Sequence, residues 1–115
     1  MTENKVIIKK LKESIEYRSK HKHFIQDFKY AVIRYFLNKY DVHVRFLTGV
    51  TWFAVELDYG YYTSSMRLPQ FKFTLQILLD FCNEFECEYD GSSCDGDRHI
   101  FTFTDVDVSN AFING

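Results

Sequence analysis

The sequence predicts an α+β fold in which helices cover one face of an antiparallel sheet. Stretches with apolar residues at helical spacing lead twice into stretches where apolar and polar residues alternate. No strand–helix–strand rhythm of the kind that builds parallel sheets is visible. The 115 residues suit one domain, 1–115, and 46% of them are hydrophobic, enough for a core without disulfides or metal ions. The predicted order is α-α-β-β-(β)-α-β-β.

Two helices are predicted at the start of the chain. Over 3–20, a narrow apolar stripe lies between charged residues. Over 22–39, a wider stripe that includes Phe24, Phe28 and Val32 is typical of a helix packed centrally. The connecting RSKHKH contains no Gly or Pro, so a single bent helix is the alternative.

A β-hairpin is predicted next. VHVRFLT (42–48) and VTWFAVELDY (50–59) both alternate apolar and polar residues, and the Thr48-Gly49 pair permits a tight turn between them. Such a hairpin buries one face and leaves the other in water. The following GYYTSSMRL (60–68) forms either a third strand or a loop. The outward face then carries His43, Arg45, Trp52, Glu56 and Asp58.

A further helix and a second hairpin complete the chain. Pro69 suits the first turn of a helix over about 70–85, because its missing N–H is not needed there. CEYDGSSCDGDRHIFTFTDV (87–106) then predicts strand, polar loop and strand, with Phe101 and Phe103 on one face. The apolar stripe of this helix consists of Leu75, Leu78, Cys82 and Phe85, widened by Ile77, Leu79 and Phe81.

An internal α-β-β pseudo-repeat relates the two halves. FLNKYDVHV (36–44) matches FCNEFECEY (81–89) at an offset of 45, and Phe53 matches Phe101 at an offset of 48. The pattern arises either by duplication or because any amphipathic helix leading into a half-buried strand resembles another. Surface positions where the two copies differ carry opposite charge.

No catalytic, cofactor or metal site is predicted. Cys82 and Cys87 lie at apolar positions, and the carboxylates around Cys94 raise a thiol pKa instead of activating it. Cys87, Cys94 and His99 do not have the spacing of a zinc site, and DGSSCDGD does not have that of an EF-hand. We therefore expect a protein that is not an enzyme.

The composition predicts a cytoplasmic protein with no membrane span. No apolar run approaches the roughly 18 residues that a span needs. Charges interrupt the N-terminal MTENKVIIKKLKESIEY where a signal peptide is apolar, and an odd number of cysteines, three, suits a reducing compartment. Abundant Phe, Tyr and Lys with few Ala and Pro are typical of A/T-rich genomes, which many bacteriophages carry.

Charge is distributed unevenly along the chain. Residues 1–40 hold ten Lys/Arg against four Asp/Glu, a balance of +6, whereas residues 41–115 hold four against twelve, a balance of −8. One alternative function is therefore nucleic-acid binding through the basic N-terminal helices, although the sequence pI near 6.0 argues against it. The residues for that role are Lys5, Lys9, Lys10, Lys12, Arg18, Lys20 and Lys22.

The leading hypothesis is a protein-binding inhibitor or modulator that occludes a partner surface, such as a phage anti-defence or host-takeover factor. An exposed Trp52 among charges and tyrosines is typical of an interaction hot spot; the alternative is that the N-terminal helix covers Trp52. An acidic surface would suit a basic partner, for example a nucleic-acid-binding host protein. A homodimer in which oppositely charged segments meet stays open. The predicted binding residues are Trp52, His43, Arg45, Glu56, Asp58, Tyr61, Tyr62, Glu84, Glu86, Glu88, Asp90, Asp95 and Asp97.

Overall fold

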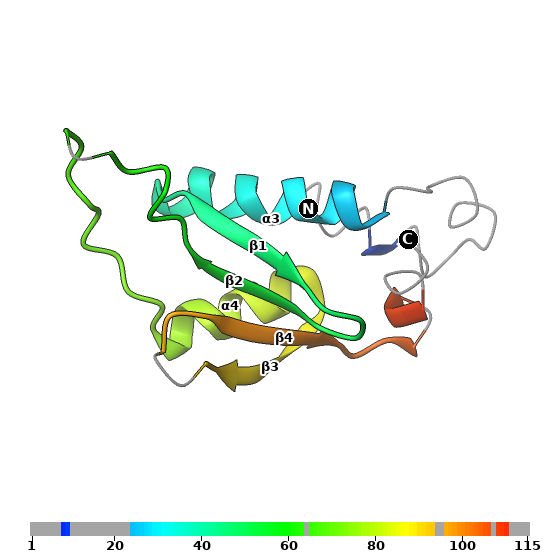
Figure 1. The fold of residues 1–115 in the computed structure, drawn as a ribbon. Helices are drawn as coiled ribbons and strands as arrows, with labels where there is room; N and C mark the ends of the chain where they lie inside the picture. Colours follow the sequence, from blue (N-terminus) through cyan, green and yellow to red (C-terminus); the bar gives the residue numbers. More distant parts are fainter. Residues whose placement is uncertain (1–7, 10–23, 64, 94–95, 107, 111–115) are drawn as a thin grey trace.

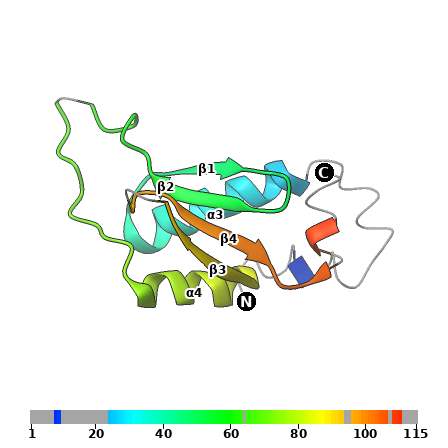
Figure 2. The same cartoon turned by 60° about the horizontal axis from the view of Figure 1, so that its bottom comes forward.

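Four strands form one antiparallel sheet with two helices on the same side of it (Figure 1 and Figure 2). The computed structural model describes residues 8–9, 24–63, 65–93, 96–106 and 108–110. The strand order is β1-β2-β4-β3, which confirms the predicted α+β class. The elements are α3 (Phe24–Tyr40), β1 (Val44–Thr48), β2 (Phe53–Leu57), α4 (Leu75–Phe85), β3 (Cys87–Ser92) and β4 (His99–Phe103).

Helix α3 confirms the helix predicted over 22–39. It buries Phe24, Phe28 and Phe36 on the face toward the sheet, as helical spacing requires. It ends at Tyr40. The next residue, Asp41, has a left-handed φ of 56°, and its N–H donates to the carbonyl of Leu37. The helix predicted over 3–20 lies outside the described residues, apart from residues 8 and 9, which are helical.

The core is built largely of phenylalanine rings. Phe53 is fully buried at its centre, and its ring centroid lies 5.0 Å from that of Phe28 and 5.4 Å from that of Phe101. The rings of Phe46 and Phe81 lie 5.5 and 6.2 Å away. These contacts join α3, β1, β2, α4 and β4. The phenylalanine rings therefore pack the two helices onto the inner face of the sheet.

The segment after β2 is a loop. Among the described residues of 60–68, none belongs to a strand, so the optional third strand is not formed. Asp58 turns the chain away from the sheet: its side chain accepts from the N–H of Gly60 at 3.1 Å, and its carbonyl accepts from the N–H of Tyr61 at 3.2 Å. The chain then projects from the body before it returns to α4 (Figure 1).

Helix α4 begins later than predicted. Thr74 caps it, with its hydroxyl accepting from the N–H of Ile77 at 3.3 Å, and Pro69 lies in the irregular chain before it. Phe71 and Phe73 approach the core as extended chain, and each is half-buried there. The predicted start near residue 70 is therefore wrong.

The apolar stripe predicted for α4 is only partly buried. Leu78, Phe81 and Phe85 face the core. Leu75 and Leu79 are 64% and 50% exposed, because one short helix on a sheet buries only a single narrow stripe.

The α-β-β order occurs twice, once on each half of the sheet. Asp41 and Glu86, which match at the offset of 45, are the two non-glycine residues with positive φ among those described, at 56° and 52°. Phe53 and Phe101, which match at the offset of 48, pair directly between β2 and β4 with stacked rings. The second strand after each helix, β2 or β4, therefore lies at the centre of the sheet, and these two strands pair with each other.

The two hairpins differ in register. Thr48, the partner of Phe53, lies eight residues after the end of α3. Tyr89, the partner of Phe101, lies four residues after the end of α4. The two halves therefore share the order of helix and strands but not the register of the hairpin. An origin by duplication stays a prediction.

Candidate functional site

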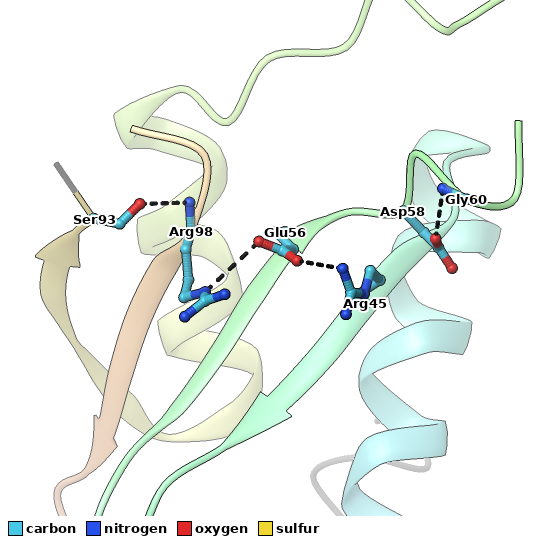
Figure 3. A network of polar contacts seen from close by, with 6 residues as sticks. All are labelled: Arg45, Glu56, Asp58, Gly60, Ser93 and Arg98. Carbon is cyan, nitrogen blue, oxygen red and sulfur yellow. Dashed lines mark hydrogen bonds and ion pairs between the residues drawn. The ribbon is translucent and has the colours of Figure 1, made fainter. Parts of the chain in front are cut away.

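A row of charged side chains crosses the face of the sheet that points away from α3 and α4, called here the outer face (Figure 3). Arg45 of β1 lies opposite Glu56 of β2, and their side chains pair through Nη1 and Oε1 at 3.1 Å. The Nε of Arg98 lies 3.7 Å from the other carboxylate oxygen of Glu56. Glu56 is only 14% exposed, whereas the arginines remain 54% and 45% exposed. The row therefore holds one shielded carboxylate between two accessible cations.

An apolar row runs beside the charged row. Leu47, Ala54 and Ile100 are direct neighbours on three adjacent strands. Ala54 is completely buried although it points outward, and the two larger side chains are half-buried. The row makes the centre of the outer face apolar, which is uncommon for a face in contact with water alone.

Trp52 lies at one end of the outer face, in the turn between β1 and β2. The N–H of Gly49 donates to the carbonyl of Trp52 at 2.9 Å, and the indole occupies the space where any larger residue at position 49 would place its Cβ. Trp52 is half-buried, so it is neither fully exposed nor part of a second core among the described residues. Glycine at position 49 therefore leaves the space that the indole occupies.

Replacing Gly49 with alanine should displace the indole. The new Cβ would overlap the Cε2 and Nε1 atoms of Trp52, so the ring must swing into solvent. Because the chain has one tryptophan, its emission maximum should move to longer wavelength and acrylamide should quench it more strongly. Val50→Ala, which alters a 74% exposed side chain in the same turn, is the control and should leave emission unchanged. An unshifted spectrum for Gly49→Ala would contradict the contact.

The other predicted aromatic residues gather at the opposite end of β1. The imidazole of His43 stacks on the ring of Tyr61, with 3.5 Å between the ring centroids. The backbone N–H of His43 donates to the hydroxyl of Tyr62 at 3.0 Å. Tyr61 is 47% exposed. The five residues of β1 lie between His43 and Gly49, and the six residue steps span roughly 20 Å. The predicted patch around Trp52 is therefore an elongated face with an aromatic group at each end.

The predicted acidic residues lie around α4 and β3, and Glu88, which pairs with Thr102, reaches the outer face at its β3 edge. Glu84 lies on α4, Glu86 ends that helix, and Glu88 and Asp90 are exposed on β3. Asp97 precedes β4, and Asp95 lies outside the described residues. Of the basic residues proposed for nucleic-acid binding, Lys9 is described and exposed. The others lie outside the described residues: Lys5, Lys10, Lys12, Arg18, Lys20 and Lys22.

Cys87 and His99 lie at opposite ends of the second hairpin, and Cys94 lies outside the described residues. Cys87 pairs with Phe103 at one end of the hairpin, and His99 pairs with Ser92 at the other. Burial raises the pKa of the Cys87 thiol well above its usual value. Within the part of the chain that the structure describes, no three His, Cys, Asp or Glu side chains are arranged to hold a metal ion.

A cavity of about 310 Å³ lies between the start of β4 and the chain that leads into α4. Sequence reasoning missed it because that chain was predicted to be helical; the alternation of Phe71 and Phe73 in PQFKF was the available sign of extended structure. His99 is 8% exposed there, and its Nδ1 lies 3.1 Å from the hydroxyl of Tyr89. The lining residues are Leu57, Tyr59, Phe71, Lys72, Phe73, Gly96, Asp97 and His99.

The buried histidine should make stability fall in mild acid. Burial lowers the pKa of His99 below its usual 6.5, against a smaller opposing attraction from Asp97. Below about pH 6.5 the unfolded chain takes up the proton first, so stability declines as pH falls from 6.5 through the lowered pKa. We expect His99→Gln to flatten the melting temperature between pH 7 and pH 5 relative to the parent protein. Equal slopes for the two proteins would contradict this.

Comparison with protein-family models, with curated proteins and with solved structures gives no match. Within the described residues, none of the helices combines the length and apolar character that crossing a membrane requires.

Proposed function

We propose that this chain is a non-enzymatic protein-binding module whose outer face covers a surface of its partner. The observation that carries the proposal is the arrangement of two rows on one face: an apolar row of Leu47, Ala54 and Ile100 beside the charged row. Among the described elements, none lies over this face (Figure 1). An apolar centre bordered by accessible arginines has the composition that protein interfaces favour.

The charged row favours a partner surface that carries carboxylates. Glu56 is shielded between Arg45 and Arg98, and each guanidinium has five N–H donors. Donors that Glu56 does not use remain available at the exposed side of each arginine. A partner carboxylate could therefore bind each arginine bidentately while apolar side chains meet the neighbouring row.

The narrower form of the proposal is an inhibitor or modulator that a bacteriophage uses against host machinery. The composition supports it, because residues with A/T-rich codons are abundant in a short chain without a catalytic motif. Occlusion of a partner surface requires only binding, which a face of this kind supplies. The acidic region around α4 and β3 stays a predicted second surface for a basic partner, and nucleic-acid binding through the N-terminal segment stays a prediction.

Affinity capture from the cells in which the protein acts tests the proposal. The bait is compared with a variant carrying Leu47→Lys and Ile100→Lys, which places two charges in the apolar row. The matched control carries Leu75→Lys and Leu79→Lys on the exposed side of α4. We expect the first variant to lose a partner that the parent and the control both retain. Retention by the first variant together with loss by the control would place binding elsewhere.

A further inference from the structure

The two edges of the sheet are protected to different degrees. At one edge, β3 contains a bulge between Tyr89 and Gly91, and its exposed residues include Glu88 and Asp90. Bulges and charges of this kind prevent another strand from pairing. At the other edge, β1 reads VRFLT, without bulge, proline or glycine and with Arg45 as its one charge. Only β1 therefore keeps the features of an edge that can accept a strand.

Alternate backbone groups of β1 point away from the sheet. The N–H of Asp58 donates to the carbonyl of His43, and the N–H of Gly49 donates to the carbonyl of Trp52, each at 2.9 Å. Since hydrogen-bonded pairs alternate in an antiparallel ladder, the odd-numbered residues of β1 bond to β2. The backbone groups of Val44, Phe46 and Thr48 then point outward, and no backbone hydrogen bond joins them to another described segment outside the sheet.

Helix α3 lies beside this edge, on the inner side of the sheet, where it packs against β1. The ring of Tyr35 points toward α4, with its centroid 5.7 Å from that of Phe81 and 5.4 Å from that of Phe85. Ile33 lies about 160° around the helix from Tyr35 at 100° per residue. It is half-buried against the core, so it presents an apolar flank on the side of α3 away from α4.

Charge distinguishes this edge from the opposite one. Residues 24–48, which form α3 and β1, contain four Lys/Arg and two Asp/Glu, a balance of +2. Residues 75–92, which form α4 and β3, contain five Asp/Glu and no Lys/Arg, a balance of −5. Arg45 is 54% exposed on β1. A strand laid along β1 would place an outward side chain beside Arg45, where a carboxylate is favoured.

We propose that the edge of β1, which no described strand pairs with on its outer side, binds an extended acidic segment of a partner protein by strand addition. Residues of that segment opposite Val44, Phe46 and Thr48 would exchange backbone hydrogen bonds with them and turn apolar side chains toward Ile33. Intervening residues would turn carboxylates toward Arg45 on the outer face. This edge shares Arg45 with the charged row, but its binding groups are the outward backbone groups of β1, which the outer-face proposal does not use. The inference therefore goes beyond the proposed function, and the backbone-methylated peptides test it independently of the apolar row.

Amide chemical shifts of the full chain test the proposal, with a synthetic peptide as the probe. The peptide has about ten residues, the upper length of an ordinary strand, and alternates valine with glutamate. We expect it to shift the amides of Val44, Phe46 and Thr48 more than those of Arg45 and Leu47, with a dissociation constant of about 1 mM or below at low salt. Added salt should weaken binding because Arg45 is exposed.

Two modified peptides serve as controls. Methylating the valine nitrogens removes the N–H groups that would face β1, and should weaken binding at least about tenfold, since each lost hydrogen bond contributes about 1 kcal/mol. Methylating the glutamate nitrogens instead leaves those groups intact and should preserve binding. Replacing glutamate with lysine should abolish the shifts.

Three results would overturn the inference. The first is the absence of shifts at these three amides with millimolar acidic peptide. The second is equal binding by the lysine peptide, and the third is equal binding by the valine-methylated peptide. If light scattering shows instead that the free protein self-associates at low salt, and the same three amides shift with protein concentration, the edge of β1 binds a second copy and the proposed partner is wrong.

Discussion

Replacing Phe53 with alanine is expected to lower the free energy of unfolding by about 3–5 kcal/mol. Phe53 is fully buried, and its ring meets the rings of Phe28, Phe46, Phe101 and Phe103 at 5.0 to 5.5 Å between centroids. These residues come from α3, β1 and β4. The variant therefore loses contacts on every side and leaves a cavity that no single neighbour can fill.

Urea unfolding followed by circular dichroism measures this loss. Val50→Ala is the matched control, because Val50 lies in the adjoining turn and is 74% exposed. Its effect should stay within about 0.5 kcal/mol, as for other surface substitutions. A loss of about 0.5 kcal/mol or less for Phe53→Ala, equal to that of the control, would contradict the position of Phe53 at the centre of the core.

Replacing Trp52 with alanine is expected to weaken binding of the captured partner by about 2 kcal/mol or more, roughly thirtyfold. The indole lies on Gly49 at the end of the outer face, so it arrives at the partner already oriented and loses little conformational freedom on binding. A large, rigid and half-buried aromatic side chain beside an apolar row is the usual form of a hot spot.

Titration calorimetry with the purified partner gives the size of this effect. Leu79→Ala removes a 50% exposed apolar side chain from α4 and should leave affinity within about a factor of two, as for residues outside an interface. Circular dichroism of both variants separates lost binding from lost folding. Equal losses from Trp52→Ala and Leu79→Ala would exclude Trp52 as an anchor.

The strands were the most predictable part of the fold. Alternation placed Val44 and Phe46 inward, Arg45 outward, and Phe101 and Phe103 on one face, and the structure confirms these positions. Side chains alternate between the two faces of a strand, so the buried face determines which residues of that strand point outward.

The start of α4 could not be predicted because two local preferences compete there. Pro69 favours a first helical turn, whereas Thr74 offers a capping hydroxyl five residues later. Burial of Phe71 and Phe73 as extended chain decides the outcome. That burial depends on the core formed by α3 and β4, which local spacing does not show.

The candidate site was predicted only in part. Arg45, Glu56 and Trp52 were among the predicted residues, whereas Arg98 and the apolar row of Leu47, Ala54 and Ile100 were not. The alternation of side chains along each predicted strand assigned Arg45, Glu56 and Trp52 to one face. It could not place Arg98 beside Glu56, because that contact depends on the pairing of β2 with β4 across a long intervening segment. Nor could it show that Glu88 lies on the same face, at the edge strand β3 beyond β4, since strand order in the sheet follows from long-range packing.

Site-specific photocrosslinking tests the protein-binding proposal most directly. A photoreactive amino acid is placed at Leu47 or Ile100 in the apolar row, and at Leu75 or Leu79 on the exposed side of α4 as controls. If the outer face binds the partner, the first two positions form crosslinks to the captured protein and the controls do not. Crosslinks from α4 alone, with none from Leu47 or Ile100, would contradict a binding role for the outer face.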